Sequence, residues 1–326
     1  MVKIDFDGEK CVGCHLCVQL CPKEVLASGN KGAKEVPRVV NAVECCACMT
    51  CAGKCPQGAI LVSQNAPLKR YIDDENEKPF EPLTAEESQT YAGYSAMLED
   101  ILKLRSKPVA ISLIRNGEPL PHIPVPSVRL RYCQALIMAR RGLSMLMPAD
   151  SHSCPDGASI LGLGKVPRKL ATGEIYVQLG KLATREAAEK MVRERPALPE
   201  NSMRATLVTP LEKTVMKPDV IAVMAPPETM MWICMASTYY SGKRSTFQMS
   251  SYNAQCVETT LFPYTTGEMN TSLGCYGCRA ISDLGEDMMF IGIPLDKMPS
   301  LIEGLRYLGR KAIKDCRAKV YLPPLI

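Results

Sequence analysis

Two short runs of cysteine decide the first part of this fold: CVGCHLCVQLCP at residues 11–22 and CCACMTCAGKCP at residues 45–56. In each run three cysteines are spaced two residues apart, and a fourth follows after three more residues and precedes a proline. Thiolates with this spacing ligate [4Fe–4S] clusters, and the fourth cysteine of each run ligates the other cluster. The spacing predicts two clusters with these ligand sets: Cys11, Cys14, Cys17 and Cys55 for the first, and Cys45, Cys48, Cys51 and Cys21 for the second.

Zinc is the alternative ligand for cysteine-rich loops. A structural zinc site takes four ligands, usually in two separated pairs, and not four in one run that ends in Cys-Pro. Two complete runs therefore favour clusters over zinc. Cys46 and His15 lie inside the loops but have no ligand position in the motif. We interpret both as bystanders.

Residues 3–62 resemble the two-cluster bacterial-type ferredoxins, including the CP-x-x-A-I ending at Ile60. The resemblance implies a small domain that carries single electrons to a redox partner protein. Free ferredoxins of this type are usually acidic, whereas basic and acidic residues nearly balance here. This balance indicates a module that is tethered to a fixed partner or belongs to a larger redox complex.

The composition of the whole chain limits the other classes. A length of 326 residues suits a small module followed by one larger unit. The net charge of +5 arises from scattered residues without a Lys or Arg run, so nucleic acid is not the implied partner. No uninterrupted apolar stretch of about 18 residues occurs, and the N-terminus lacks the apolar core of a signal peptide. We therefore expect a cytoplasmic chain without a membrane span.

The cysteine content points to metal. Sixteen cysteines cannot form a disulfide framework in the cytoplasm, because that compartment keeps thiols reduced. Nine of them lie between Cys11 and Cys55. Such a dense group indicates oxygen-sensitive metal and favours an anaerobic host.

The rest of the chain divides into a linker and a larger domain. Residues 63–90 are polar and charged, with three prolines and no apolar period, and are typical of a linker. Residues 91–326 begin with a helical pattern over 91–104 and continue with PVAISLI (108–114), which is typical of a buried strand. We therefore expect an α+β chain: a 2[4Fe–4S] domain over 1–62, and a cysteine-rich α/β or α+β domain over 91–326.

This larger domain contains a candidate internal repeat. The order strand, helix, strand and a cysteine that opens a second helix occurs twice, and the first helix of each copy ends at a glycine that suits a C-cap. The first copy is PVAISLI (108–114), RYCQALIMARRG (131–142), LSMLM (143–147) and Cys154. The second copy is DVIAVMA (219–225), MWICMASTYYSG (231–242), STFQM (245–249) and Cys256. The pattern predicts two related halves, about 107–210 and 211–310.

Several of the remaining cysteines are candidates for a third site. Cys154, Cys256 and Cys275 follow expected strands directly, where a loop can expose a side chain. Cys275 and Cys278 form a C-x-x-C pair, which can chelate metal, act as a redox dithiol or be structural. Unpaired cysteines also serve as small buried hydrophobes. Spacing alone does not decide whether these cysteines bind metal, act as a redox dithiol or pack in the core.

Residues 107–310 resemble an uncharacterised archaeal-type cysteine-rich family, domain-of-unknown-function family 169. The matching pieces include RYCQALIMARRG, SCPDGASILGLG, PDVIAVMAPPETMM and FPYTTGEMNTSLGCYGCR. The resemblance picks out four shared cysteines and, less securely, a fifth: Cys133, Cys154, Cys256 and Cys275, and then Cys278. Four thiolates without a nearby carboxylate or histidine set suit a third iron–sulfur cluster or another soft-metal centre.

These observations lead to a functional hypothesis. We expect an iron–sulfur electron-transfer protein, a ferredoxin-coupled oxidoreductase in which two [4Fe–4S] clusters pass electrons to a third thiolate-bound site. One alternative is a non-catalytic electron-transfer or docking subunit of a larger anaerobic complex. A weaker alternative is a carrier of clusters, sulfur or metal. No acid–base pair is recognisable, so no catalytic residue is assigned.

Overall fold

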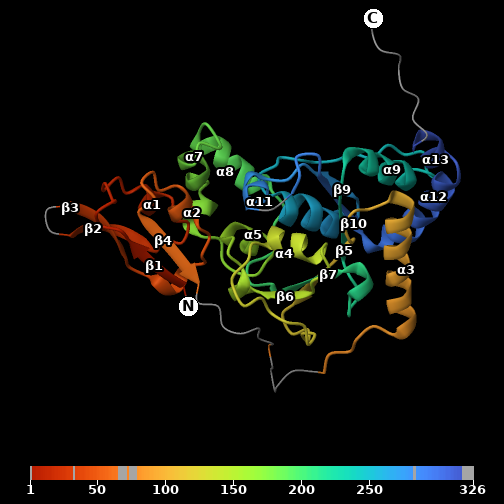
Figure 1. Ribbon diagram of the computed structural model, residues 1–326, viewed down its shortest axis with the longest axis horizontal. Coiled ribbons are helices and arrows are strands. Elements are labelled where there is room, and N and C mark those ends of the chain that lie inside the picture. Colours follow the sequence, from red (N-terminus) through yellow and green to blue (C-terminus); the bar gives the residue numbers. More distant parts are fainter. Residues whose placement is uncertain (1, 32–33, 65–71, 73–78, 282–283, 318–326) are drawn as a thin grey trace, which may run out of the picture. The chain divides into compact units, whose positions relative to one another are not determined.

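The computed structural model describes residues 2–31, 34–64, 72, 79–281 and 284–317 (Figure 1). It contains both helices and strands, as expected for an α+β chain. The α-helices are α1 (Leu16–Gln19), α2 (Thr50–Gly53), α3 (Ala85–Leu102), α4 (Tyr132–Ala139), α5 (Pro155–Ile160), α6 (Arg168–Ala171), α7 (Glu174–Gln178), α8 (Arg185–Glu194), α9 (Pro227–Ser237), α10 (Phe262–Thr266), α11 (Tyr276–Ile281), α12 (Met298–Arg310) and α13 (Ala312–Arg317). The strands are β1 (Val2–Phe6), β2 (Leu26–Lys31), β3 (Lys34–Val39), β4 (Ile60–Gln64), β5 (Val109–Arg115), β6 (Met145–Pro148), β7 (Met203–Pro210), β8 (Val220–Ala225), β9 (Asn270–Ser272) and β10 (Met289–Pro294).

Two compact units make up the chain, and each takes several segments of sequence. The first unit comprises Met1–Phe80, Leu113–Ala135 and Met145–Leu207, and the second comprises Glu81–Ser112, Leu136–Ser144 and Val208–Ile326. In this division the ferredoxin module shares its unit with later segments of the chain. Part of the expected linker, residues 65–71 and 73–78, lies outside the described residues.

The ferredoxin module is built from two small antiparallel sheets. Strands β1 and β4 pair from Val2 opposite Gln64 to Phe6 opposite Ile60, and β2 pairs with β3. Its buried core is small and contains cysteines as well as aliphatic side chains: Cys17, Cys21, Val25, Leu26, Ala47, Ile60 and Val62. So little apolar burial leaves much of the stability to whatever the cysteines bind.

A six-stranded sheet with the order β6-β7-β5-β8-β10-β9 forms the centre of the larger domain. The central pair β5 and β8 is antiparallel, as are β8 with β10 and β10 with β9. The order is symmetric about the central pair. The three strands of the first expected half lie on one side, and the three of the second half lie on the other.

A local motif repeats with this symmetry. Strand β7 runs into Pro-Leu-Glu-Lys and β10 into Pro-Leu-Asp-Lys, and a short 3-10 helix follows each strand. The backbone N–H of Leu211 donates to the carbonyl of Pro108, next to β5, at 2.9 Å. The backbone N–H of Leu295 donates to the carbonyl of Asp219, next to β8, at 3.1 Å. These matched bonds follow the same symmetry as the strand order.

Two details of the expected repeat are wrong. Residues 245–249 form no strand, and nearly all of their side chains are exposed. Their β-forming side chains have no buried face to pack against, so propensity does not decide their structure. Strand β9 occupies the corresponding edge of the sheet instead. Cys256 lies within a π-helix, Ala254–Leu261, and does not open an α-helix.

Helices α3, α9 and α12 cover part of the core of the second unit (Figure 1). Helix α3 begins at Ala85, inside the range expected to be a linker, because Thr84 and Glu87 form a capping box there. Buried side chains from all three helices meet in one cluster, among them Leu98, Ile233 and Leu305, which are fully buried. None of the helices in the described part of the chain is long and apolar enough to cross a membrane.

Gly292 allows the π-helix to lie directly against β10. A Cβ at this position would overlap the carbonyl oxygen of Thr259 and lie 2.8 Å from Cγ of Pro263.

We expect Gly292→Ala to lower the free energy of unfolding by about 1–3 kcal/mol, because the core would be overpacked. Gly93→Ala on α3 is the matched control, since a Cβ there meets nothing within 4 Å. That control should stabilise by about 0.5–1 kcal/mol. Denaturant midpoints measured without oxygen test both signs, and an unchanged midpoint for Gly292→Ala would contradict the packing.

Candidate iron–sulfur centres

The two cysteine loops of the ferredoxin module have matching backbones. Gly13 and Ala47, each two residues after the first cysteine of a run, have φ of 73° and 54°. His15 and Met49, just before α1 and α2, have φ of 52° and 61°. Left-handed residues among right-handed ones turn successive N–H groups to one side of the loop, which favours an anionic group such as an iron–sulfur cluster.

Each loop encloses a cavity with four motif cysteines in its wall. The first cavity has an empty volume of about 340 Å³, and the cysteines in its wall are Cys11, Cys14, Cys17 and Cys55. The second has about 370 Å³, and the cysteines in its wall are Cys21, Cys45, Cys46, Cys48 and Cys51. Each cavity thus brings three cysteines of one run together with the fourth cysteine of the other run.

The fourth cysteines have matching hydrogen bonds. The backbone N–H of Val25 donates to Sγ of Cys21, and that of Ala59 donates to Sγ of Cys55, both at 3.3 Å. Burial opposes ionisation of other thiols, because it raises the pKa of Cys17 to about 11 and that of Cys51 to about 12. Iron displaces these protons when it binds, so cluster binding and folding of the loops are coupled. The donor set and the cavities fit two clusters.

Cys46 and His15 lie in the cavity walls. Cys46 is buried, and the hydrogen bond between its thiol and Cys48 lowers the pKa of Cys48 and raises that of Cys46. Cys154 is one of the groups whose charge acts on Cys46, which places it near the second cavity. In the first cavity wall, Nε2 of His15 lies 3.3 Å from Oε2 of Glu35.

Two arginines from the segment before α4 hold the loop of the second cavity. Arg129 donates from its guanidinium to the carbonyl of Cys45, and Arg131 donates to the carbonyl of Cys48 at 2.9 Å. Gln64 at the end of β4 fixes the position of Arg129, because its side chain accepts from the backbone N–H of Arg129 at 2.9 Å. This loop is therefore bound directly to the chain that leads to Cys133.

The segment before α4 is also joined to the segment before α5. Leu130 and His152 form a parallel β-bridge, and the rings of Tyr132 and His152 stack with centroids 6.4 Å apart. Cys133 follows Tyr132 directly, and Cys154 is the N-cap of α5. The structure thus connects the neighbourhoods of Cys133 and Cys154 to the second cavity within one unit.

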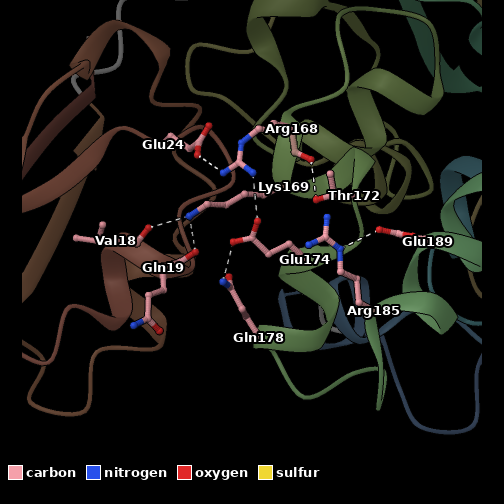
Figure 2. A network of polar contacts seen from close by, with 10 residues as sticks. All are labelled: Val18, Gln19, Glu24, Arg168, Lys169, Thr172, Glu174, Gln178, Arg185 and Glu189. Carbon is pink, nitrogen blue, oxygen red and sulfur yellow. Dashed lines mark hydrogen bonds and ion pairs between the residues drawn. The ribbon is translucent and has the colours of Figure 1, made fainter.

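A second contact area ties the first cysteine run to α6. Figure 2 shows Lys169 reaching the end of α1, where its Nζ donates to the carbonyls of Val18 and Gln19 at 3.1 and 2.7 Å. Arg168 next to it pairs with Glu24 at 2.7 Å. Lys169 is only 7% exposed, so its charge has exchanged water for these carbonyls. The buried lysine and its two carbonyl partners therefore make a specific contact between α1 and α6.

Cys275 and Cys278 contact each other in the second unit. The N–H of Cys278 donates to Sγ of Cys275 at 3.4 Å, and the N–H of Cys275 donates to Sγ of Cys278 at 3.1 Å. The pKa of Cys275 is lowered, first by the hydrogen bond from the Cys278 thiol and then by backbone N–H groups that include Ala254. The π-helix that carries Cys256 begins at Ala254. Cys256 and Cys275 therefore lie in neighbouring segments.

The expected third site is divided between the two units. Cys133 and Cys154 belong to the first unit, and Cys256, Cys275 and Cys278 to the second. Among the residues with described positions, no three His, Cys, Asp or Glu side chains are close enough to hold a single metal ion. The cavity cysteines of the ferredoxin module are not close enough to hold a single ion either. This spacing is expected for cluster ligands, because their sulfurs surround a core of eight atoms and lie farther apart than the ligands of one ion.

Sequence reasoning missed Arg129, Arg131 and Lys169. Their partners lie 83–151 residues away in the chain, so no local pattern marks these contacts. The sequence shows Arg131 two positions before the candidate ligand Cys133, but it does not indicate that this side chain binds the carbonyl of Cys48.

Comparison with known proteins identifies both parts. Residues 10–60 match a family model described as a 4Fe–4S dicluster domain, and residues 97–304 match the model of DUF169, described as uncharacterised ArCR. An uncharacterized protein of Methanocaldococcus jannaschii, MJ0308, is 29% identical over 213 residues, which are 64% of this chain and 91% of the relative. An uncharacterized ferredoxin of the same organism, MJ0722, is 39% identical over 80 residues, which are 23% of this chain and 92% of the relative. No solved structure matches.

Proposed function

From the premise that the chain belongs to the DUF169 family and carries a 4Fe–4S dicluster domain, we propose that it is a ferredoxin-coupled oxidoreductase. The dicluster domain supplies iron–sulfur electron transfer. In the proposal, a redox partner protein or complex reduces the ferredoxin module. Electrons then pass one at a time to a thiolate centre in the DUF169 domain, where a substrate is reduced.

The observation that carries this proposal is the attachment of the second cavity to the DUF169 domain. Arg131 donates to the carbonyl of Cys48, and Cys133 is two residues farther along. A freely exchanging ferredoxin needs no such contacts with its acceptor, whereas a fused donor gains effective concentration from them. The second cluster is accordingly the exit point for electrons.

The cluster ligands in this proposal follow the two cavities. The first cluster is held by Cys11, Cys14, Cys17 and Cys55, and the second by Cys45, Cys48, Cys51 and Cys21. Residues 1–62 form the module that holds them. Cys46 shares the second cavity but donates to a ligand, so it tunes the cluster's hydrogen bonding and does not bind iron.

In the proposal the third centre keeps the four cysteines expected from the sequence: Cys133, Cys154, Cys256 and Cys275. Two observations support this set. The segment that carries Cys133 is joined to the segment that carries Cys154. The segment that carries Cys256 likewise neighbours the segment that carries Cys275. Soft thiolates without carboxylates suit a further iron–sulfur cluster. Cys278 acts on this centre through its hydrogen bonds to Cys275.

A pair of variants in the second cavity tests the ligand assignment. We expect Cys48→Ser to lose about four irons per chain and the matching electron paramagnetic resonance signal of the reduced protein. Cys46→Ala, in the same cavity wall, should retain the iron and shift only the reduction potential, because it removes a hydrogen bond to a ligand sulfur. Iron analysis and spin quantification without oxygen measure both. Equal iron loss in the two variants would contradict the assignment.

A further inference from the structure

An open cavity in the second unit has none of the candidate cluster cysteines in its wall. Its empty volume, including its mouth, is about 1160 Å³, which suits a small molecule. The walls are the end of α9, residues 241–246 and the start of α12. The floor is apolar, since Met269 and Leu301 are 7% and 1% exposed.

Cations dominate the mouth of this cavity. Lys243, Arg244 and Lys297 line it together with one carboxylate, Glu268. Lys297 is paired with Glu268 at 3.2 Å. Among the described residues, Lys243 and Arg244 have no carboxylate partner. Two adjacent unpaired cations favour an anionic ligand with more than one charge, and a guanidinium presents a fork that fits phosphate oxygens.

The loop that carries Lys243 and Arg244 also brings hydroxyl groups to the cavity. Ser241, Ser245 and Thr246 come from the same loop and line the cavity. The backbone N–H of Lys243 donates to Oγ of Ser241 at 3.1 Å, so that hydroxyl keeps its own hydrogen for a ligand. Hydroxyl donors beside a lysine and an arginine form the donor set that phosphate groups accept from.

An exposed aromatic ring lies beside this donor set. Tyr240 lines the cavity and is 58% exposed. The ring of Tyr239 contacts the ring of Tyr240 edge-on, with centroids 5.1 Å apart and an interplanar angle of 84°. The hydroxyl of Tyr240 is hydrogen-bonded to Glu303. Contacts at the edge and at the hydroxyl fix the ring and leave its flat face for stacking with a planar ligand ring.

We propose that this cavity binds a phosphorylated small molecule with a planar heterocyclic ring, of the nucleotide class, with its phosphates at Lys243 and Arg244 and its ring on Tyr240. The apolar floor and the cationic mouth match the two ends of such a ligand. This site goes beyond the proposed function and does not depend on the clusters.

Titration calorimetry with the full chain, prepared without oxygen, tests the proposal with ADP, inorganic pyrophosphate and adenosine as probes. ADP should bind more tightly than either fragment. Lys243→Gln combined with Arg244→Gln should weaken ADP binding by about tenfold or more. Lys190→Gln combined with Arg193→Gln on α8 removes two exposed charges that do not line the cavity and should leave the affinity unchanged. Tyr240→Ala should weaken binding of ADP but not of pyrophosphate.

Four outcomes would overturn the proposal: no binding of ADP, unchanged ADP affinity in the Lys243 and Arg244 variant, adenosine binding as tightly as ADP, or pyrophosphate binding as tightly as ADP. The third outcome removes the role of the cations, and the fourth removes the role of the ring. Iron content and the cluster absorbance of each variant, compared with the wild type, separate lost binding from lost folding.

Discussion

Removal of iron from the chain is expected to unfold the ferredoxin module, residues 1–62, while the core of the second unit stays folded. The module's core consists of a few aliphatic side chains together with cysteines, including Cys17 and Cys21. Burial raises the pKa of several of these thiols, so the polypeptide alone does not hold them as a set of thiolates. Cluster binding energy is therefore folding energy for this module. The second unit has a large aliphatic core of its own, which includes Leu98 and Leu305.

Limited proteolysis with mass mapping, before and after iron chelation, measures this effect. Cleavage should become fast within residues 1–62 and should stay slow in helix α3. Release of the module also frees the carbonyls of Val18 and Gln19 from Lys169. Protease resistance of residues 1–62 that persists after all iron is removed would contradict the expected coupling.

Asp156→Ala is expected to destabilise the first unit by about 3–5 kcal/mol, because it leaves a buried arginine without a counter-charge. Oδ1 of Asp156 lies 2.6 Å from Nη1 of Arg195, and the two side chains are 12% and 8% exposed. Tyr176 donates to the other carboxylate oxygen. Asp156 sits in the first turn of α5, two residues after the N-cap Cys154. The substitution should also loosen the segment that presents this cysteine.

A surface pair provides the control for this substitution. Arg185 and Glu189 on α8 are paired at 2.9 Å with side chains 61% and 43% exposed, so Glu189→Ala should cost only about 0.3–0.5 kcal/mol. The double variant Asp156→Leu with Arg195→Met should recover much of the loss, since it removes both charges. Denaturant midpoints of the four proteins give the comparison. Equal shifts for Asp156→Ala and Glu189→Ala would show that burial of the pair does not matter.

Local spacing predicted the parts of this molecule whose chemistry is local. The positions of cysteines within each run determine which of them face one cavity, because the loop between them is only two or three residues long. The segments around β5, α4, β6, β8 and α9 were expected from apolar runs and from the glycines after the helices. The start of α3 was missed although Thr84 and Glu87 have the spacing of a capping box.

Long-range contacts set the limit of what the sequence predicts. Lys169 resembles any surface lysine in the sequence, and its burial follows from the carbonyls at the end of α1 about 150 residues earlier. The stretch 245–249 has strand-forming residues, but no partner strand or core is there to pair with them. The π-helix around Cys256 depends on the absence of a side chain at Gly292, far along the chain.

The measurement that tests the central claim most directly is iron and acid-labile sulfide per chain, prepared without oxygen, for the wild type and for Cys275→Ser. The account predicts about twelve irons in the wild type and about eight in the variant, because a third [4Fe–4S] centre would lose a ligand while the ferredoxin clusters remain. About eight irons in both proteins would contradict a third cluster. The chain would then be an electron-transfer subunit whose remaining cysteines act as thiols or pack in the core.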